Sequence, residues 1–378
     1  MKRSAASALL PAGLLDLLPS DAAFEASVVE RLAAAFEAHG YERVKPPLLE
    51  FETSLLAGAG AAMAEHIFRL MDPVSQRMMG LRADMTPQVA RIAATRLKKA
   101  PRPLRLSYAG QVLRVRGSEL RPARQLGQAG VELIGAADPA ADAEVILLAA
   151  EALAALGVAA ITVDLNLPTL VPVIGRARGF EGEALAALVA ALDRRDSAAI
   201  ARAAGREAAL FGKLQRATGP ADRALGALQA LALPPTAAAE LDKLVAVVAA
   251  LRAGMKRLSL TIDPVEHRGF EYHNGVGFSL FANRARSELG RGGRYVSGEG
   301  EPSTGFSLYL DALIEALPAP APQPRIYLPP ETAPSVGARL RREGWITLAG
   351  FGAGDPKAEA RRLGCTHLWR AGRACRVR

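Results

Sequence analysis

The sequence predicts an α+β fold: an antiparallel sheet flanked by helices, with a helical insertion and a small C-terminal α/β appendage. Residues 125–134 alternate between polar or small and apolar side chains, as a half-buried strand does. Residues from about 168 to 255 are rich in Ala and Leu at helical spacing, which predicts the insertion. A proline-rich stretch then predicts a linker. We therefore expect a core over 1–317, a linker over 318–330 and the appendage over 331–378.

Composition narrows the class of protein. The chain has 378 residues, half of them hydrophobic, and 47 Lys and Arg against 38 Asp and Glu give a net charge of +9. This charge suits a nucleic-acid binder, but no basic run carries interleaved aromatics, and a GC-rich genome also produces arginine. Cys365 and Cys375 are too far apart for a CxxC pair. No apolar run is long enough for a signal peptide or a membrane span. We expect a cytoplasmic protein without metal or cofactor.

The first 82 residues combine one helix with short strands. Proline pairs place a strand at an edge or start of a sheet, and Ser or Asp caps a helix. The expected elements are a turn-rich start over 13–19, a helix from Ser20 or Asp21 to about His39, a strand over 41–50 broken by Pro46 and Pro47, and a hairpin of 65–70 with 78–82.

A helix is predicted over 88–98, because Thr86 and Pro87 suit its N-cap and first position. Asp84 then lies between a strand end and a helix start. That position is common both for a binding carboxylate and for a plain capping Asp, and the sequence leaves the two open.

The most informative stretch is a hairpin whose second strand covers residues 125–134. In that strand Gln128, Gly130 and Glu132 share one face. A glycine between Gln and Glu leaves room for a small polar ligand, and the hairpin brings Arg114 of the preceding strand nearby. An acid, an amide and an arginine facing one space suit the ammonium and carboxylate of an amino acid. The alternative is an exposed sheet face with solvated charges.

The remaining elements follow the same patterns. Arg268, Tyr272 and His273 supply a cation and two hydrogen-bonding rings, whereas the glycines of 290–295 most often serve turns. The elements expected are a helix over 138–156, strands over 160–165, 258–262 and 276–281, helical spacing from about Leu308 within 303–317, and in the appendage a strand over 325–328, a helix over 335–343 and a strand over 345–348.

The order of these pieces resembles the class II aminoacyl-tRNA synthetase core, and specifically histidyl-tRNA synthetase, over about residues 13–317. Several motifs occur in the right order, which makes the resemblance specific. They are Gly13, Asp16 and Pro19 at the start, Pro47 at the end of the dimer-forming first motif, Arg114 in the second motif, Gln128 and Glu132, the RGFEY stretch 268–272 that resembles the histidine-specific RGLDYY, and GGRY at 292–295 that resembles GGRYD.

The departures from the synthetase are concentrated in the ATP half of the site. LRVR replaces FRxE, so Arg116 stands where the synthetase has a glutamate that helps hold ATP. In the third motif Ala312 replaces the arginine that clamps the γ-phosphate, and Tyr309 replaces a glycine. Val296 replaces the Asp of GGRYD, while RADMT at 82–86 keeps an acid and a hydroxyl in place of RPEGT. Because phosphoryl chemistry depends on positioned positive charge, adenylation should fail.

The pattern resembles a synthetase paralogue family, the regulatory subunits of short-form ATP phosphoribosyltransferase. The resemblance implies a non-catalytic subunit that binds L-histidine and both activates and feedback-regulates a separate catalytic subunit in the first step of histidine biosynthesis. It also implies a homodimer within a hetero-oligomer, an octamer, without tRNA charging. The implied histidine-binding residues are Asp84, Thr86, Gln128 and Glu132 around the ammonium, Arg114 or Arg268 at the carboxylate, and Tyr272 with His273 at the imidazole.

Two alternatives remain for the function. A true histidine–tRNA ligase would need the arginine that Ala312 replaces and a longer C-terminal domain. Another synthetase-like protein, such as a tRNA-binding or stress-sensing module, would show a basic stripe or a full RNA-binding appendage, and the sequence shows neither.

Overall fold

The computed structural model describes residues 10–117, 121–267, 269–270, 272–298, 300–320, 323–352 and 354–377. The chain forms two compact units, Met1–Pro318 and Ala319–Arg378. The boundary between them lies at the start of the proline-rich segment.

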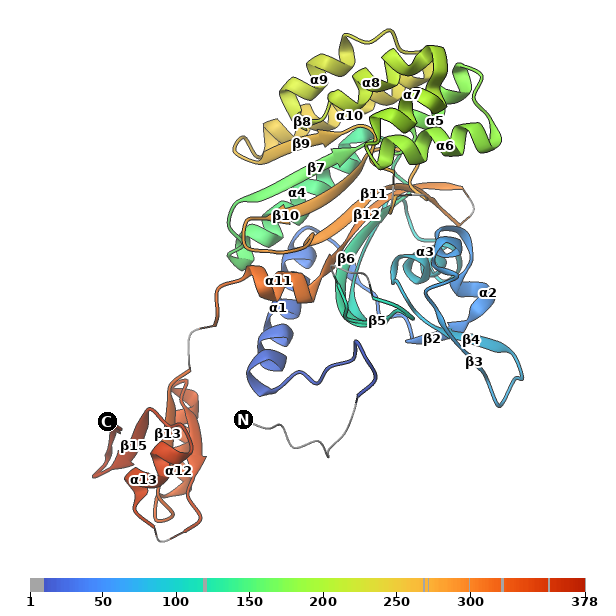
Figure 1. The fold of residues 1–378 in the computed structure, drawn as a ribbon. Coiled ribbons are helices and arrows are strands. Elements are labelled where there is room, and N and C mark those ends of the chain that lie inside the picture. Colours follow the sequence, from blue (N-terminus) through green and yellow to red (C-terminus); the bar gives the residue numbers. More distant parts are fainter. Residues whose placement is uncertain are drawn as a thin grey trace. The chain divides into compact units, whose positions relative to one another are not determined.

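A nine-stranded sheet forms the frame of the first unit (Figure 1). Its neighbours are antiparallel except for two parallel pairs, β1 with β5 and β7 with β9. The sheet is therefore mixed, and the predicted antiparallel arrangement holds for its central strands. In spatial order the strands are β1 (Glu42–Arg43), β5 (Leu104–Leu113), β6 (Gln125–Ile134), β12 (Glu301–Tyr309), β11 (Gly290–Ser297), β10 (Gly277–Ala282), β7 (Ile161–Asn166), β9 (Ser259–Asp263) and β8 (Gly219–Pro220).

Helices cover one face of this sheet. They are α1 (Pro19–Ala38), α4 (Pro139–Leu156) and α11 (Leu310–Ala316). Ala129, Val131 and Leu133 of β6 belong to the hydrophobic core that these helices share, and the Phe36 ring of α1 contacts the Phe306 ring edge to face at 5.7 Å. The alternation of 125–134 between two faces is confirmed, because Ala129, Val131 and Leu133 face the helices and leave the even-numbered residues to the other face. The prediction that the strand is half-buried is wrong, because both faces are covered and every residue after Gln125 is buried.

The second face carries a smaller layer at its β5–β6 end. Val89 of helix α3 (Thr86–Thr95) and Met85, which precedes the helix, pack against Leu106 and Leu126. The layer also contains α2 (Glu52–Leu55), the 3₁₀ helix η1 (Gly58–Met63) and a three-stranded sheet of β2 (Leu49–Phe51), β4 (Met78–Leu81) and β3 (Phe68–Met71).

Two predictions in this layer are corrected. The single strand expected over 41–50 is wrong, because β1 and β2 belong to different sheets and the proline pair separates them. Thr86 is not the N-cap of α3 but its first residue, and the backbone N–H of Thr86 donates to Asp84 Oδ1 at 2.8 Å. Asp84 therefore lies one residue before the N-cap Met85, and one of its oxygens accepts from the first N–H of the helix without occupying the cap position.

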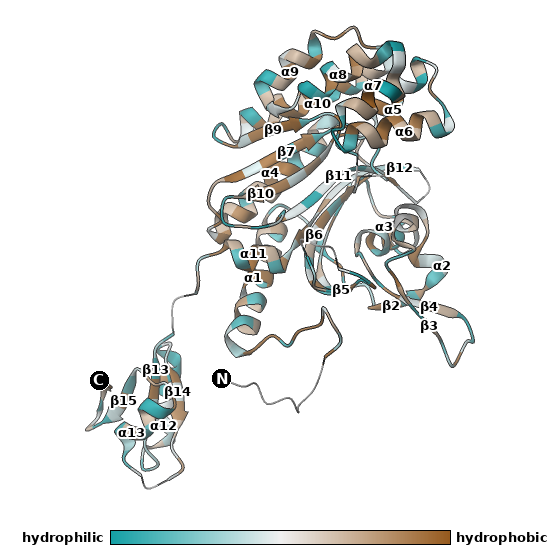
Figure 2. Cartoon of the chain, in the orientation of Figure 1, coloured by the Kyte–Doolittle hydropathy of each residue, from teal (hydrophilic) through white to brown (hydrophobic). Residues whose placement is uncertain are grey.

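The helical insertion lies between the parallel neighbours β7 and β9. The prediction that it has a core of its own is wrong, because Leu188, Phe211 and Leu244 belong to the same continuous hydrophobic core as Leu165 of β7. Helix α9 of the insertion contacts β9, and Figure 2 shows hydrophobic stretches along β9 and the neighbouring β7. Its helices are α5 (Leu170–Ala177), α6 (Gly182–Asp193), α7 (Ser197–Ala204), η2 (Gly205–Glu207), α8 (Ala208–Arg216), α9 (Ala221–Gln229) and α10 (Pro235–Gly254).

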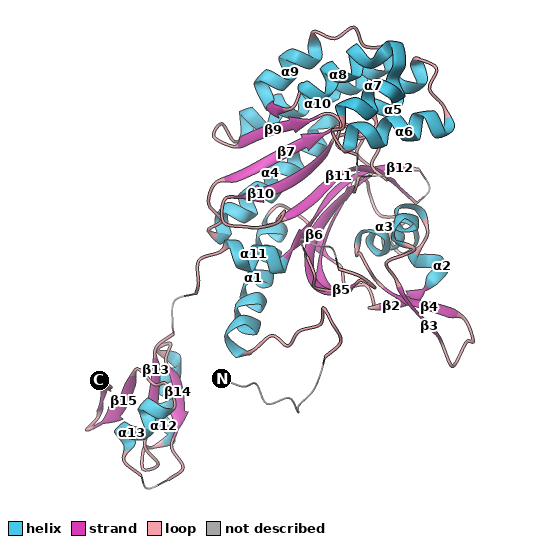
Figure 3. Cartoon of the chain, viewed as in Figure 1, coloured by secondary structure: helices cyan, strands magenta, loops and turns pink. Residues whose placement is uncertain are grey.

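The second unit is a four-stranded sheet with one helix on each face (Figure 3). Leu340 of α12 (Pro334–Arg342) packs on Ile326 on one face of this sheet. Ala360 of α13 (Pro356–Arg362) packs on Tyr327, whose side chain points to the opposite face. The last helix and the final two strands were missed in the sequence. In spatial order the strands are β14 (Ile346–Ala349), β13 (Arg325–Leu328), β15 (His367–Arg370) and β16 (Arg373–Arg376), and the helices are α12 (Pro334–Arg342) and α13 (Pro356–Arg362).

Across the described ranges, no helix combines the length and the apolar character that crossing a membrane requires.

Candidate functional site

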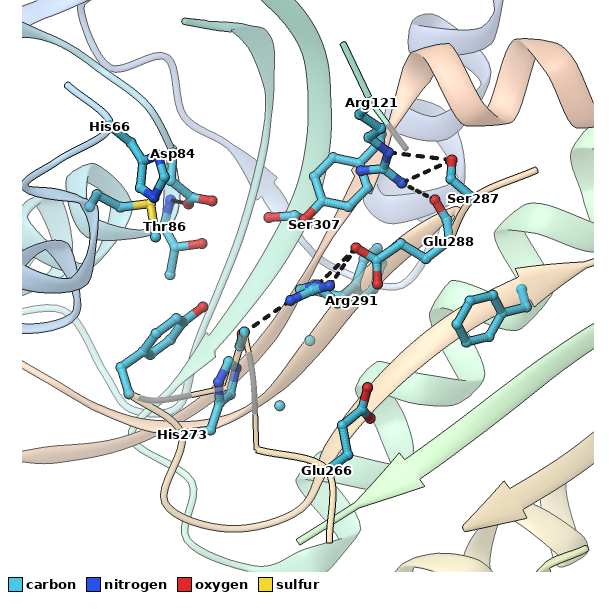
Figure 4. A pocket seen from close by; sticks show the side chains of 18 of the residues that line it. His66, Asp84, Thr86, Arg121, Glu266, His273, Ser287, Glu288, Arg291 and Ser307 are labelled. Atoms are coloured by element: carbon cyan, nitrogen blue, oxygen red, sulfur yellow. Dashed lines mark hydrogen bonds and ion pairs between the residues drawn. The ribbon is translucent and has the colours of Figure 1, made fainter. Parts of the chain in front are cut away.

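A cavity of about 1680 Å³ opens on the sheet face opposite α1 and α4. Its lining comes from the loop before α3, from β6, β11 and β12, and from the loop between β9 and β10 (Figure 4). Six of the predicted site residues line it: Asp84, Thr86, Arg114, Glu132, Tyr272 and His273.

The strand register arranges the cavity floor in rows. Tyr108, Gly130, Ser307 and Arg291 are consecutive cross-strand neighbours on β5, β6, β12 and β11. Neighbouring strands lie about 4.8 Å apart, so these four residues form a continuous polar row. Tyr108 and Ser307 can be recognised as site residues only from their pairing with Gly130, and the sequence alone does not show this pairing.

Glycines in the next row make space for functional side chains. Glu132 is the cross-strand neighbour of Gly305, which is itself paired with Gly293. A Cβ at Gly305 would overlap the Glu132 carboxylate, and one at Gly293 would lie 2.7 Å from His273 Cδ2. The glycine-rich stretch 290–295 is therefore a strand, in which Gly293 leaves space for His273, while Gly305 of β12 leaves space for Glu132.

Gly130 does not provide the ligand space expected from the sequence. A Cβ at Gly130 would lie 2.6 Å from the Tyr108 hydroxyl, because the Tyr108 ring already fills the space above this glycine. Gly130 thus accommodates an aromatic residue of the site and not the ligand itself.

A closed hydrogen-bond network joins the acidic side of the cavity. Gln128 Nε2 donates to Asp84 Oδ2 at 3.0 Å and to Ser307 Oγ at 2.7 Å. The Tyr108 hydroxyl lies 2.9 Å from Ser307 Oγ and donates to Glu132 Oε1 at 3.2 Å. Gln128 is fully buried and lies behind Asp84, so it orients this carboxylate instead of lining the cavity.

Glu132 is a buried carboxylate held by hydroxyls. Its side chain is almost fully enclosed, and the Tyr295 hydroxyl donates to Oε2 at 2.8 Å. Burial raises the pKa of Glu132 to about 8, although the hydrogen bonds from its neighbours lower it in part. Without a cation beside it, this group holds a proton at neutral pH. Tyr295 was part of a quoted motif but was not recognised as a site residue.

Two ring residues line the cavity beside the acidic network, where the Tyr272 and Tyr295 rings lie with centroids 6.1 Å apart. The Tyr272 and His273 rings lie with centroids 4.1 Å apart. Burial, together with Arg291, lowers the pKa of His273 to about 3, so its imidazole is neutral. His273 Nδ1 is buried and has no hydrogen-bond partner within the part of the chain that the structure describes. The ring therefore presents an unused polar atom.

The arginines of the cavity differ in how they are held. Arg114 lines the cavity, and its Nε donates to the Ala83 carbonyl at 3.4 Å. Arg268 lies outside the described residues. Arg291 and Glu288 were missed in the sequence, although both line the cavity as an ion pair of 2.6 Å. No sequence signal marked Arg291, because its position depends on the β11–β12 pairing.

The residues that depart from the synthetase pattern have distinct positions. Tyr309 and Arg116 line the cavity, and the Arg121 guanidinium lies 3.9 Å above the Tyr309 ring. Ala312, where the synthetase has its arginine, is buried in the helical core of α11. The arginine that clamps the γ-phosphate in the synthetase is therefore replaced there by a small, buried apolar side chain.

Comparisons with known proteins show which family and fold the chain is similar to. The family model of histidyl-tRNA synthetase matches residues 13–313. The ATP phosphoribosyltransferase regulatory subunit of Paramagnetospirillum magneticum is 58% identical, over 97% of each chain. The protein of the same name from Rhodospirillum rubrum is 51% identical, over 97% of this chain and 96% of the relative.

Solved structures show the same fold at low identity. An ATP phosphoribosyltransferase regulatory subunit/histidyl-tRNA synthetase from Bacillus halodurans superposes with a TM-score of 0.83 at 23% identity, covering 95% of this chain and 97% of the other. A histidyl-tRNA synthetase from Nostoc sp. PCC 7120 gives a TM-score of 0.80 at 18% identity, covering 96% and 91%. The predicted class II synthetase-like fold is confirmed.

Proposed function

The chain belongs to the family of ATP phosphoribosyltransferase regulatory subunits, and on this premise we propose that its cavity binds L-histidine and passes the signal to a separate catalytic subunit. Its relatives carry a name that assigns a regulatory and not a catalytic role. The observation that supports histidine as the ligand is that one cavity is lined both by the Asp84–Glu132 network and by the neutral His273 ring.

The acidic network suits an ammonium group. Asp84 and Glu132 line the cavity, while Gln128 and Tyr108 fix their orientation from behind. An ammonium next to Glu132 would favour its charged form and so replace the proton that burial retains. Thr86 adds a hydroxyl, 3.4 Å from the Tyr108 hydroxyl, at the same end. An arginine holds the carboxylate, for which the sequence indicates Arg114 or Arg268.

The two ring residues, Tyr272 and His273, suit an imidazole. A neutral imidazole carries one donor and one acceptor nitrogen, so two such rings can pair. The unpartnered Nδ1 of His273 offers such a partner, and Tyr272 lines the cavity beside it. A buried polar atom without a partner costs about 1–3 kcal/mol, which binding of an imidazole would relieve.

The proposal extends to the assembly. The chain forms a homodimer that associates with catalytic subunits in a hetero-oligomer, an octamer, in the cytoplasm. It neither adenylates histidine nor charges tRNA, because Tyr309 and Arg121 fill the cavity side where ATP would lie and Ala312 supplies no cation.

Calorimetric titration of the full chain with L-histidine tests the ligand. We expect saturable binding of one molecule per chain and much weaker binding of L-alanine, which lacks the imidazole. Equal affinity for both amino acids, or no heat with L-histidine alone or in the presence of the catalytic subunit, would refute the assignment.

A further inference from the structure

Arg291 on β11 is fixed in one orientation at the cavity floor. Its Nε and one terminal nitrogen donate to Glu288 Oε1 at 3.0 and 2.6 Å. The other terminal nitrogen donates to the Gly269 carbonyl at 3.2 Å. Figure 4 shows this guanidinium between Glu288 and His273, inside the cavity. A side chain restrained at three atoms loses little further freedom when it binds a ligand.

The contacts that Arg291 makes with the described residues do not use all of its donors. A guanidinium has five N–H groups, and these three contacts leave one on each terminal nitrogen. Two such groups match the two oxygens of a carboxylate, the bidentate pairing that arginine forms best. Arg291 lines the cavity, so these donors can reach a ligand.

The spacing between Arg291 and Glu132 fits an α-amino acid. Arg291 is paired with Ser307, Ser307 with Gly130, and Glu132 follows two residues along β6. Strand spacings of about 4.8 Å and rises of about 3.3 Å per residue place the two Cα atoms roughly 12 Å apart on one sheet face. The two side chains can then approach a zwitterion from opposite sides, the carboxylate of Glu132 at its ammonium.

Three other described arginines at or near the cavity are less suited to this role. Arg114 follows the last residue of β5 and lies four residues beyond Gly110, the cross-strand neighbour of Gln128. Its Cα is therefore roughly 13 Å from that row of the sheet. Arg294 donates to Asp142 Oδ2 at 3.0 Å and to the Ala136 carbonyl at 2.8 Å, outside the cavity lining. Arg121 contacts Ser287 and lies over Tyr309.

On these grounds, and resting on the proposed function, we propose that Arg291 is the residue that binds the α-carboxylate of L-histidine. The site then selects a free α-amino acid by both of its charged groups, the ammonium at Asp84 and Glu132 and the carboxylate at Arg291. L-Histidinol, which carries a hydroxymethyl group in place of the carboxylate, should bind to the wild-type chain roughly ten-fold to a hundred-fold more weakly.

The test compares L-histidine with L-histidinol on the full chain by calorimetry. In Arg291→Gln the affinity for L-histidine should fall roughly ten-fold to a hundred-fold, while that for L-histidinol changes by less than about three-fold. The preference for histidine over histidinol should therefore nearly disappear. Arg286→Gln is the matched control, since Arg286 also lines the cavity but is largely exposed and paired with Glu315 at 3.1 Å. It should keep the wild-type preference.

The outcomes separate this inference from the proposed function. If Arg291→Gln keeps the full preference, or if Arg114→Gln removes it instead, the carboxylate assignment is wrong while histidine binding stands. If Arg291→Gln weakens both ligands equally, its role is structural and the assignment is again wrong. Should Arg291→Gln not fold, Arg291→Lys keeps the charge without the bidentate fork and must still lose part of the preference. A wild-type chain that binds no L-histidine overturns both proposals.

Discussion

Glu132 is a carboxylate that the fold encloses and supplies with hydroxyl donors, but not with a cation among the described residues. Tyr295 and Tyr108 donate to its two oxygens, and burial still raises its pKa to about 8. Removing a carboxylate from water is costly unless an opposite charge compensates it. The residue is therefore poised for a ligand that brings a positive charge.

Replacing Glu132 tests whether its charge pairs with the ammonium of the ligand. Glu132→Gln keeps the size of the side chain but removes the charge that pairs with an ammonium, so L-histidine affinity should fall roughly ten-fold to a hundred-fold. Glu266→Gln is the matched control, because Glu266 lines the same cavity but accepts from Asn166 Nδ2 at 2.9 Å, away from the network. Titration calorimetry of both variants measures the effect. Equal losses, or none in Glu132→Gln, would show that the ammonium lies elsewhere.

The raised pKa of Glu132 also predicts a proton linkage. Below about pH 8 the free chain holds a proton on Glu132, which pairing with an ammonium displaces. Affinity should therefore rise with pH between about 6 and 8, with release of up to one proton per histidine at the lower end. Calorimetry in two buffers of different ionisation enthalpy counts this proton. Proton uptake in the wild type, or unchanged release in Glu132→Gln, would contradict the linkage.

The raised pKa of Glu132 also makes its contribution to folding stability depend on pH. The ordinary pKa of 4.5 in the unfolded chain is lower than the folded value of about 8, so the folded state binds the proton more tightly. The contribution of Glu132 to stability therefore falls as pH rises from about 4.5 towards 8. Histidine binding offsets this loss over the same range.

At the scale of elements, the site depends on glycines in the sheet. Gly130 and Gly305 have no Cβ, and this lets the Tyr108 ring and the Glu132 carboxylate cross the strands beside them. A side chain at either position would displace a residue of the acidic network. The glycines thus determine where the network can lie.

Gly130→Ala tests this dependence. Its Cβ would meet both the Tyr108 ring and the Phe306 carbonyl, and backbone cannot give way as a flexible side chain does, so we expect a loss of about 1–3 kcal/mol or more. Gly226→Ala in α9 is the control, because its Cβ would have no neighbour within 4 Å and should gain up to about 1 kcal/mol from helix propensity. Urea unfolding midpoints measure both. A stable Gly130→Ala chain would show that the sheet can adjust.

The elements also show what the sequence could and could not predict. The alternation of 125–134 and the cap of α4 by Asp138 were predictable, since each follows from local chemistry. Strand β11 could not be predicted, because its glycines look like turn residues. In the fold they leave space for side chains and backbone of neighbouring segments. Arg291 was missed for the same reason. Its role depends on pairing with β12, and cross-strand neighbours distant in sequence leave no local pattern.

At the scale of the whole molecule, each unit has a core of its own. Hydrophobic clusters of the first unit hold the sheet, the insertion and the cavity, and two smaller clusters lie on the two faces of the C-terminal sheet. The short appendage was predicted as an α/β element from its linker and first strand. Its last helix and hairpin were missed because a few arginines and glycines conceal their short apolar pattern.

The regulatory role is tested most directly by the activity of the assembled complex. The purified catalytic subunit, with ATP and phosphoribosyl pyrophosphate, is assayed alone, with this chain and with Glu132→Gln, over a series of L-histidine concentrations. We expect activity to need the chain, inhibition by L-histidine with the wild type, and a roughly ten-fold to hundred-fold higher inhibitory concentration with Glu132→Gln. Activity that is indifferent to the chain, or the same inhibition curve with both chains, would contradict a histidine-binding regulatory subunit.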